Sequence, residues 1–142
     1  MTHEFFNPVR SRFGAGALSS LPELVARRRT LLVTFPEARA LGLTQRVEQL
    51  LGVQLAGVIE DVRPNPDVAE LKPMYEAFWR RGGAELIVAI GGGSAIDTAK
   101  ALMVGTATGR FDELVAALAG GQPFEPARTL PLIAVPTTAG TG

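Results

Sequence analysis

The chain has 142 residues, a length that favours one domain with a buried core, and its 46% hydrophobic and 20% charged residues argue against disorder. Its 14 basic residues balance its 14 acidic residues, and zero net charge argues against a nucleic-acid binder. The sequence has no cysteine, which excludes a thiolate metal site and a cysteine nucleophile, and its one histidine, His3, argues against a multi-histidine metal site or a His-based triad within these residues.

The N-terminal segment, residues 5–13, is the first predicted element. It has Asn7-Pro8 in its middle and is interpreted as a hairpin on the edge of a sheet. The polar N-terminus lacks the pattern of a signal peptide, and the longest uncharged run, residues 129–142, contains two prolines and is too short to span a bilayer. We therefore expect a cytoplasmic protein with neither a membrane nor a nucleic-acid partner.

Apolar runs of strand length alternate with helical patterns along the rest of the chain. The predicted strands are residues 31–34, 53–59, 86–90 and 132–135. The last two are continuously apolar, which is typical of strands that helices cover on both faces. The predicted helices are residues 21–28, 44–51, a segment that follows Asp67, and 94–106. This alternation predicts an α/β fold with a doubly wound, mostly parallel, Rossmann-like sheet.

The helix that follows Asp67 contains a residue that is unfavourable for helices. Asp67 and Glu70 have the spacing of a capping box, and the apolar side chains after them recur at helical intervals. Pro73 costs about 3 kcal/mol in a helix interior, so we expect a kink or a later helix start.

A run of three glycines, Gly91, Gly92 and Gly93, with Ser94 after it, lies between the third strand and a helix. Glycine lets backbone N–H groups approach a ligand, and a helix N-terminus adds unpaired donors and partial positive charge. This arrangement predicts a phosphate or pyrophosphate site at the carboxyl edge of the sheet. The alternative is a tight turn in which Ser94 is the N-cap. Asp97 either contacts the ligand or completes a capping box and pairs with Lys100.

Two further segments follow strands and therefore belong to the same edge. The threonine–glycine segment, residues 136–142, carries the hydroxyls of Thr137, Thr138 and Thr141, which are suited to ribose or phosphate, although a plain loop has a similar composition. Asn65 lies between two prolines in a rigid turn, where asparagine also occurs for structural reasons alone.

With these motifs, the chain resembles the N-terminal domain of the iron-containing (group III) alcohol dehydrogenases. The matching segments occur in the family order and are residues 13–16, 64–66, 91–100 and 135–142. The resemblance implies that the domain binds NAD or NADP and that the protein reduces aldehydes or oxidises alcohols. Branches that act on maleylacetate or phosphonoacetaldehyde share much of the pattern.

The resemblance also implies roles for particular residues. Gly92, Gly93 and Ser94 would hold the pyrophosphate, and Gly91 would belong to the same cofactor-binding loop. Asp97 would lie near the nicotinamide half, and Asn65 would contact the cofactor. The three threonines would line the path from adenine to phosphate. The family's Fe2+ or Zn2+ is held by one Asp and three His of a helical C-terminal domain, so neither metal ligands nor catalytic residues are expected in this chain.

One position departs from the family pattern. Members that use NAD often carry an acidic residue after the first strand, where it holds the ribose 2′-hydroxyl. Here that residue is Phe35, which we expect to pack beside the adenine, although Glu37 is close. The choice between NAD and NADP therefore stays open.

Residues 1–142 are expected to form a truncated dinucleotide-binding domain, because the chain stops inside the threonine–glycine segment. The full-length protein is expected to be a homo-oligomer with a small alcohol or aldehyde substrate, and the 142-residue chain to be inactive. Two alternatives stay open. One is an NAD-dependent sugar-phosphate cyclase similar to dehydroquinate synthase, and the other is a module that only binds a dinucleotide.

Overall fold

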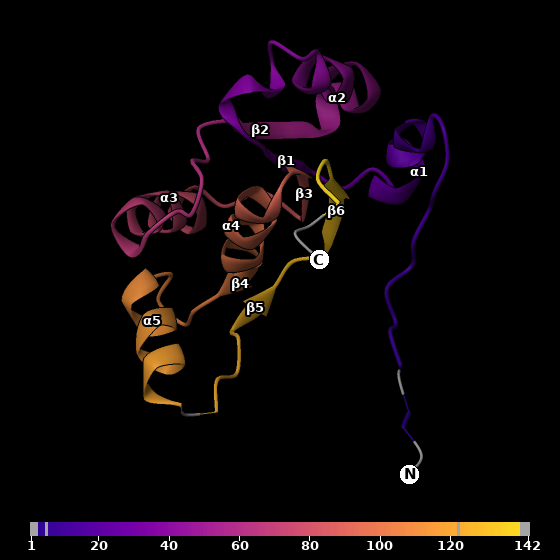
Figure 1. Cartoon of the computed structure of the whole chain (residues 1–142). Coiled ribbons are helices and arrows are strands. Elements are labelled where there is room, and N and C mark those ends of the chain that lie inside the picture. The colour runs from indigo at the N-terminus through magenta and orange to yellow at the C-terminus, as the bar shows by residue number, and fades with distance from the viewer. Residues whose placement is uncertain (1–2, 5, 122, 140–142) are drawn as a thin grey trace.

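Four parallel strands form the centre of the fold, in the order β2-β1-β3-β6 (Figure 1). The computed structural model describes residues 3–4, 6–121 and 123–139. The strands are β1 (Thr30–Val33), β2 (Leu55–Ile59), β3 (Leu86–Gly91) and β6 (Leu132–Pro136). The four strands predicted from the apolar runs are therefore confirmed, with ends that shift by one or two residues.

Helices cover both faces of this sheet, as predicted for a doubly wound fold. On one face, Leu32, Val88 and Ile90 pack with buried side chains of α1 (Leu21–Val25) and α2 (Leu43–Leu51). The alternate residues of the strands face the other way, towards α3 (Val68–Arg81), α4 (Gly93–Met103) and α5 (Phe111–Gly120). The described residues also form short 3-10 helices at Ala17–Ser20, Pro36–Ala38 and Gly52–Gln54.

The centre of the sheet explains why β1 and β3 have no alternation of polar and apolar residues. Every residue of both strands is buried. Such strands lose all contact with water, so each of their side chains stabilises the fold through burial. No helix in the described part of the chain combines the length and the apolar character needed to cross a membrane.

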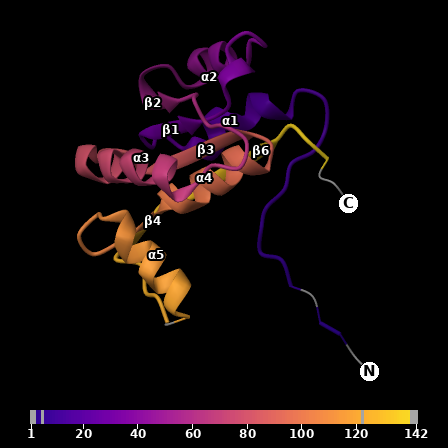
Figure 2. The same cartoon turned by 60° about the vertical axis from the view of Figure 1, so that its left-hand side comes forward.

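A second, antiparallel sheet lies beyond the end of α4. It pairs β4 (Val104–Gly105) with β5 (Arg128–Thr129), and α5 lies in the chain between them. The helix predicted for residues 94–106 ends at Met103, because the chain becomes extended at Val104 to pair with β5. Figure 2 shows β4 and α5 on the opposite side of the molecule from the chain end that follows β6.

The helix α3 is continuous through Pro73. Asp67 is its N-cap, and the Asp67 side chain accepts a hydrogen bond from the backbone N–H of Glu70 at 2.9 Å, as the capping spacing predicts. A later start is therefore wrong. Proline deprives the carbonyl of Ala69 of its helical donor, and because both residues are exposed, water can hydrogen-bond that carbonyl.

The hairpin expected at residues 5–13 does not form among the described residues of that segment. Residues 6–13 contain no strand and leave the body of the protein as an extended arm (Figures 1 and 2). Phe6 and Phe13 are 81% and 93% exposed, so neither side chain has the packing that stabilises a hairpin. The arm contacts the body through Arg12, which forms an ion pair with Glu23 of α1 at 2.7 Å.

Candidate functional site

The carboxyl ends of β1 and β3 define the candidate site. The chain runs from β1 outwards to β2, and then returns to place β3 on the other side of β1. Such a reversal opens a crevice at the carboxyl ends of the two strands, where α/β proteins bind ligands. Phe35 follows β1, and its ring lies 3.1 Å from the point that a Cβ on Gly91 would occupy. The two predicted residues therefore meet at this edge.

The glycine loop is closely packed on one side and open on another. Gly91 has φ +150°, and a Cβ there would lie 2.8 Å from the Cβ of Ala95, so only glycine fits. A Cβ on Gly92 would lie 3.5 Å from Cγ2 of Thr138, which is ordinary contact. A Cβ on Gly93 would meet no atom of the described residues within 4 Å. The loop thus leaves open space beside Gly93 for a ligand.

Among the described residues, no side chain caps the N-terminus of α4 at this loop. The N-cap is Gly92 and the first helical residue is Gly93, so the interpretation of Ser94 as N-cap is wrong. The Ser94 hydroxyl instead accepts a hydrogen bond from the backbone N–H of Asn65 at 3.0 Å. Helix N-termini present N–H donors and partial positive charge, and an uncapped one is suited to bind an anion.

Asp97 does not complete a capping box. Its carboxylate pairs with Lys100 one turn later, at 3.1 Å, and its side chain is 71% exposed. The ion pair with Lys100 was predicted by the interpretation in which Asp97 has a structural role and does not contact a ligand. The structure therefore gives Asp97 a partner on its own helix.

The other two predicted segments also reach this edge. Asn65 has φ +50°, a left-handed conformation that asparagine tolerates, and its N–H contacts Ser94 across 29 residues of sequence. Thr137 donates its backbone N–H to the carbonyl of Gly91 at 3.0 Å, and Thr138 lies against Gly92. Thr141, the third predicted threonine, lies outside the described residues.

A cavity of about 300 Å³ lies beside this edge and contains a polar group that the sequence patterns did not single out. It is lined by Asp61, Arg63 and Glu70 and by Thr98 of α4, among others. Thr98 is 1% exposed, and its hydroxyl has no hydrogen-bond partner among the described residues. Thr98 lies within the matching segment 91–100, but nothing in that segment predicted a role for its hydroxyl.

The described residues do not provide a metal centre. No group of three or more His, Cys, Asp or Glu side chains within residues 3–4, 6–121 and 123–139 is arranged to hold an ion. What the edge offers is an uncapped helix N-terminus, a glycine loop and hydroxyl groups. That chemistry is suited to bind a phosphate-containing ligand.

Comparisons with known proteins agree with this geometry. Residues 8–142 match the family described as iron-containing alcohol dehydrogenase. The chain is 39% identical to 4-hydroxybutyrate dehydrogenase of Cupriavidus necator over 97% of its length. It is 36% identical to lactaldehyde reductase of Escherichia coli K12 over 91% of its length.

Among solved structures, the chain is similar to sulfoacetaldehyde reductase from Bifidobacterium kashiwanohense, which was crystallised in complex with NAD+. The TM-score is 0.80 at 30% identity, over 99% of this chain and 37% of that one. The chain spans 36% of the 4-hydroxybutyrate dehydrogenase and 34% of the lactaldehyde reductase. It therefore corresponds to about a third of each relative.

Proposed function

Because the chain belongs to the iron-containing alcohol dehydrogenase family, we propose that it is the nucleotide-binding part of a metal-dependent, NAD(P)-linked alcohol dehydrogenase or aldehyde reductase. The observation that carries this proposal is the uncapped N-terminus of α4 behind the glycine loop. The NAD+ complex of the structural relative supports the choice of ligand. The relatives named above are dehydrogenases and reductases, which favours hydride transfer over the reaction of a sugar-phosphate cyclase.

In this proposal, the pyrophosphate of the dinucleotide lies over the glycine loop. The N–H groups at the start of α4 donate to its oxygens, and the absence of a Cβ at Gly92 and Gly93 lets the backbone come close. Ser94 holds the Asn65 turn against the loop through their hydrogen bond of 3.0 Å. Asn65 thereby supplies a second wall for the cofactor.

Residues at the carboxyl edge of the sheet are also assigned to the adenine end and the nicotinamide end of the dinucleotide. Phe35, beside Gly91, packs against the adenine, and Thr137 and Thr138 together with Thr141 line the path from adenine to phosphate. Asp97 is assigned to the nicotinamide half, where binding requires it to exchange Lys100 for a ligand contact. Both NAD and NADP are retained as ligands, because Phe35 replaces the carboxylate that selects the ribose 2′-hydroxyl.

The described residues bind and orient the dinucleotide in this proposal, and they take no part in metal chemistry. No cluster among them fits Fe2+ or Zn2+. The site residues of this chain therefore act by fixing the nicotinamide at the edge of the sheet, where a substrate can approach it.

The substitution Gly92→Val tests the loop assignment. Gly92 has φ −81° and ψ −168°, a conformation that valine adopts readily, so the change fills the space between the loop and Thr138 without backbone strain. A valine side chain at Gly92 blocks the close approach of the pyrophosphate to the backbone N–H groups, so we expect NADH binding to be weaker by about tenfold or more. Titration of the wild-type and variant chains with NADH, followed by NADH fluorescence or calorimetry, measures this.

Ala119→Val is the control, because it places the same valine side chain at an exposed position of α5. It should bind NADH like the wild type. Circular dichroism verifies that the Gly92→Val chain is folded. If the folded variant binds NADH as tightly as the wild type, the loop does not hold the cofactor. The same titration with NADPH decides between the two dinucleotides.

A further inference from the structure

A second pocket lies at the opposite end of α4 from the glycine loop. Its volume is about 440 Å³, within the range of small-molecule sites. Its walls come from the end of α3, from the loop between β4 and α5, and from Arg128 of β5. The 11 residues of α4 separate it from the loop by about 16 Å along the helix axis. It is therefore separate from the proposed dinucleotide site.

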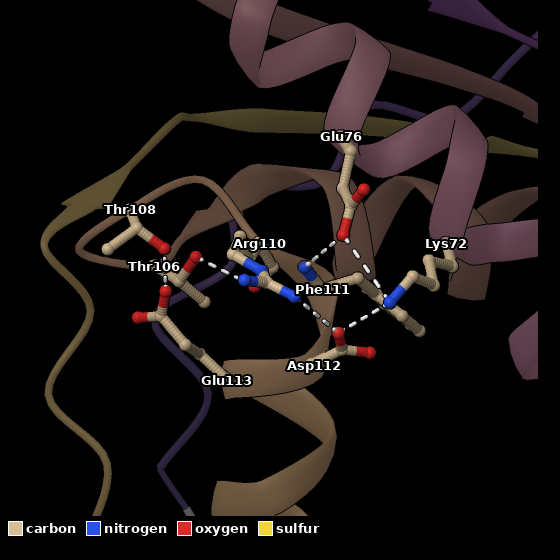
Figure 3. Close-up of polar contacts among 8 residues, drawn as sticks. All are labelled: Lys72, Glu76, Thr106, Thr108, Arg110, Phe111, Asp112 and Glu113. Atoms are coloured by element: carbon tan, nitrogen blue, oxygen red, sulfur yellow. Dashed lines mark hydrogen bonds and ion pairs between the residues drawn. The ribbon is translucent and has the colours of Figure 1, made fainter.

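The charges around this pocket are predominantly positive. Arg80, Arg110 and Arg128 line it, and Glu76 is its one acidic lining residue. Figure 3 shows that Lys72 approaches Glu76, at 3.8 Å, and that Arg110 approaches Asp112, at 3.3 Å. Arg80 and Arg128 form no ion pair with any residue that the structure describes. Two guanidinium groups therefore remain available to a ligand.

The pocket is built on a fixed wall. Trp79 lines it, and Gly105 and Gly109 both lie against this side chain, with Gly105 so close that an added Cβ would be 2.8 Å from the ring. The Arg128 guanidinium lies 6.0 Å from the centre of the Trp79 ring. A hydrogen bond from the backbone N–H of Phe111 to the carboxylate of Glu76, a lining residue of the pocket, joins α5 to α3 (Figure 3).

We propose that this pocket binds the phosphate group of a small phosphorylated molecule, through Arg80 and Arg128. Two unpaired guanidinium groups match the charge of a phosphate dianion, and guanidinium donates paired hydrogen bonds to phosphate oxygens. The hollow has room for the carbon skeleton of a phosphomonoester beside the Trp79 ring. The ligand approaches from the amino ends of the strands, away from the edge that α/β folds ordinarily use.

The position of the tryptophan allows a direct test. Trp79 is the one tryptophan of the chain, so its fluorescence reports on this pocket and on no other. We expect orthophosphate and glycerol 3-phosphate, added at constant ionic strength, to change this fluorescence saturably, and glycerol to leave it unchanged. Arg80→Gln and Arg128→Gln should each weaken the phosphate affinity about tenfold. Both residues are exposed, so circular dichroism should show folded variants.

Two controls make the result specific. Arg81→Gln removes the same charge from the adjacent residue of α3, which does not line the pocket, and should retain the phosphate affinity. Gly92→Val should also retain it, because the glycine loop lies at the other end of α4.

The proposal is overturned by any of four results. The first is the absence of a saturable fluorescence change, and the second is wild-type phosphate affinity in the Arg80→Gln and Arg128→Gln variants. The third is a loss of phosphate affinity in Arg81→Gln or Gly92→Val as large as the loss in those two variants. The fourth is binding of malonate, a dianion that contains no phosphate, as tightly as phosphate.

Discussion

At the scale of the residue, Gly105 is a position where an added Cβ would collide with a neighbouring side chain. Its φ lies outside the left-handed region, so backbone conformation does not require glycine there. The requirement comes from Trp79, because a Cβ would lie 2.8 Å from Cη2 and 2.9 Å from Cζ2 of the indole. The indole packs beside the rings of Tyr75 and Phe78, with ring centroids 6.3 and 5.2 Å from its own.

Gly105→Ala is therefore expected to destabilise the chain. Overpacking of this kind costs about 1–3 kcal/mol of the free energy of unfolding. Urea or thermal unfolding, followed by circular dichroism, measures the loss. Gly93→Ala is the matched control, since its added methyl group meets nothing within 4 Å, and it should leave stability equal or raise it. Equal stability of the Gly105→Ala chain would mean that the Trp79 ring moves freely.

At the scale of the element, α5 is attached to α3 partly by charge. Lys72 of α3 forms an ion pair with Asp112 in the first turn of α5, and Arg110 contacts the same carboxylate (Figure 3). The hydrogen bond from Lys72, with a smaller contribution from Arg110, lowers the pKa of Asp112 below its ordinary value. The negative charge at the helix N-terminus also suits the helix dipole.

This shift sets the pH dependence of the contact. Because the pKa of Asp112 is lower in the folded chain than in the unfolded chain, the pair stabilises the fold above the unfolded-state pKa. That contribution is lost as the pH falls through the lowered pKa. An NMR titration of the Asp112 carboxyl should show the low pKa, and Lys72→Met should move it back towards the ordinary value. An unchanged pKa in that variant would contradict the pairing.

The strands of the central sheet show how much of the fold can be predicted from the sequence. The strand β3 is an apolar run with turn residues at its ends, and its burial on both faces follows from that pattern. The same pattern predicted cover on both faces for residues 132–135, which is wrong, because β6 stands last in the strand order and its Ala134 is exposed. Because strands of a parallel sheet end at one edge, the placing of Phe35, the glycine loop and Thr137 there also follows. Neither inference requires knowledge of distant contacts.

Contacts between distant segments decided the remaining features. The pairing of β4 with β5 joins residues more than 20 positions apart and involves only two residues on each side, which is too short for a periodic pattern. Ser94 is bonded to Asn65 rather than to its own helix, and local capping rules cannot foresee this. The N-terminal arm has apolar residues suited to a strand, but it pairs with no strand among the described residues.

At the scale of the whole molecule, the 142-residue chain is expected to bind a dinucleotide but not to catalyse hydride transfer between it and a substrate. Its described residues contain no cluster that fits a divalent metal, and the family relatives are about three times as long. In an absorbance assay with NADH, an aldehyde and added Fe2+ or Zn2+, the rate of NADH loss should equal the rate without protein.

A full-length relative such as lactaldehyde reductase serves as the positive control in that assay. Aldehyde-dependent NADH oxidation by the 142-residue chain that disappears in Gly92→Val would contradict the expectation, because it would assign complete catalysis to these residues.

The order of the strands also has a consequence for how the chain folds. β1 pairs directly with β3, and the Thr34 hydroxyl donates to the carbonyl of Ile90 at 2.8 Å across 56 residues of sequence. The centre of the sheet thus closes a long loop, whose entropy cost must be met before the strands gain their contacts, and parallel pairing of this kind is slow. Phe35 and Gly91 come together only at that step. The chain therefore acquires the edge that we propose for dinucleotide binding at the same time as the centre of its sheet, and an incompletely folded chain has no such edge.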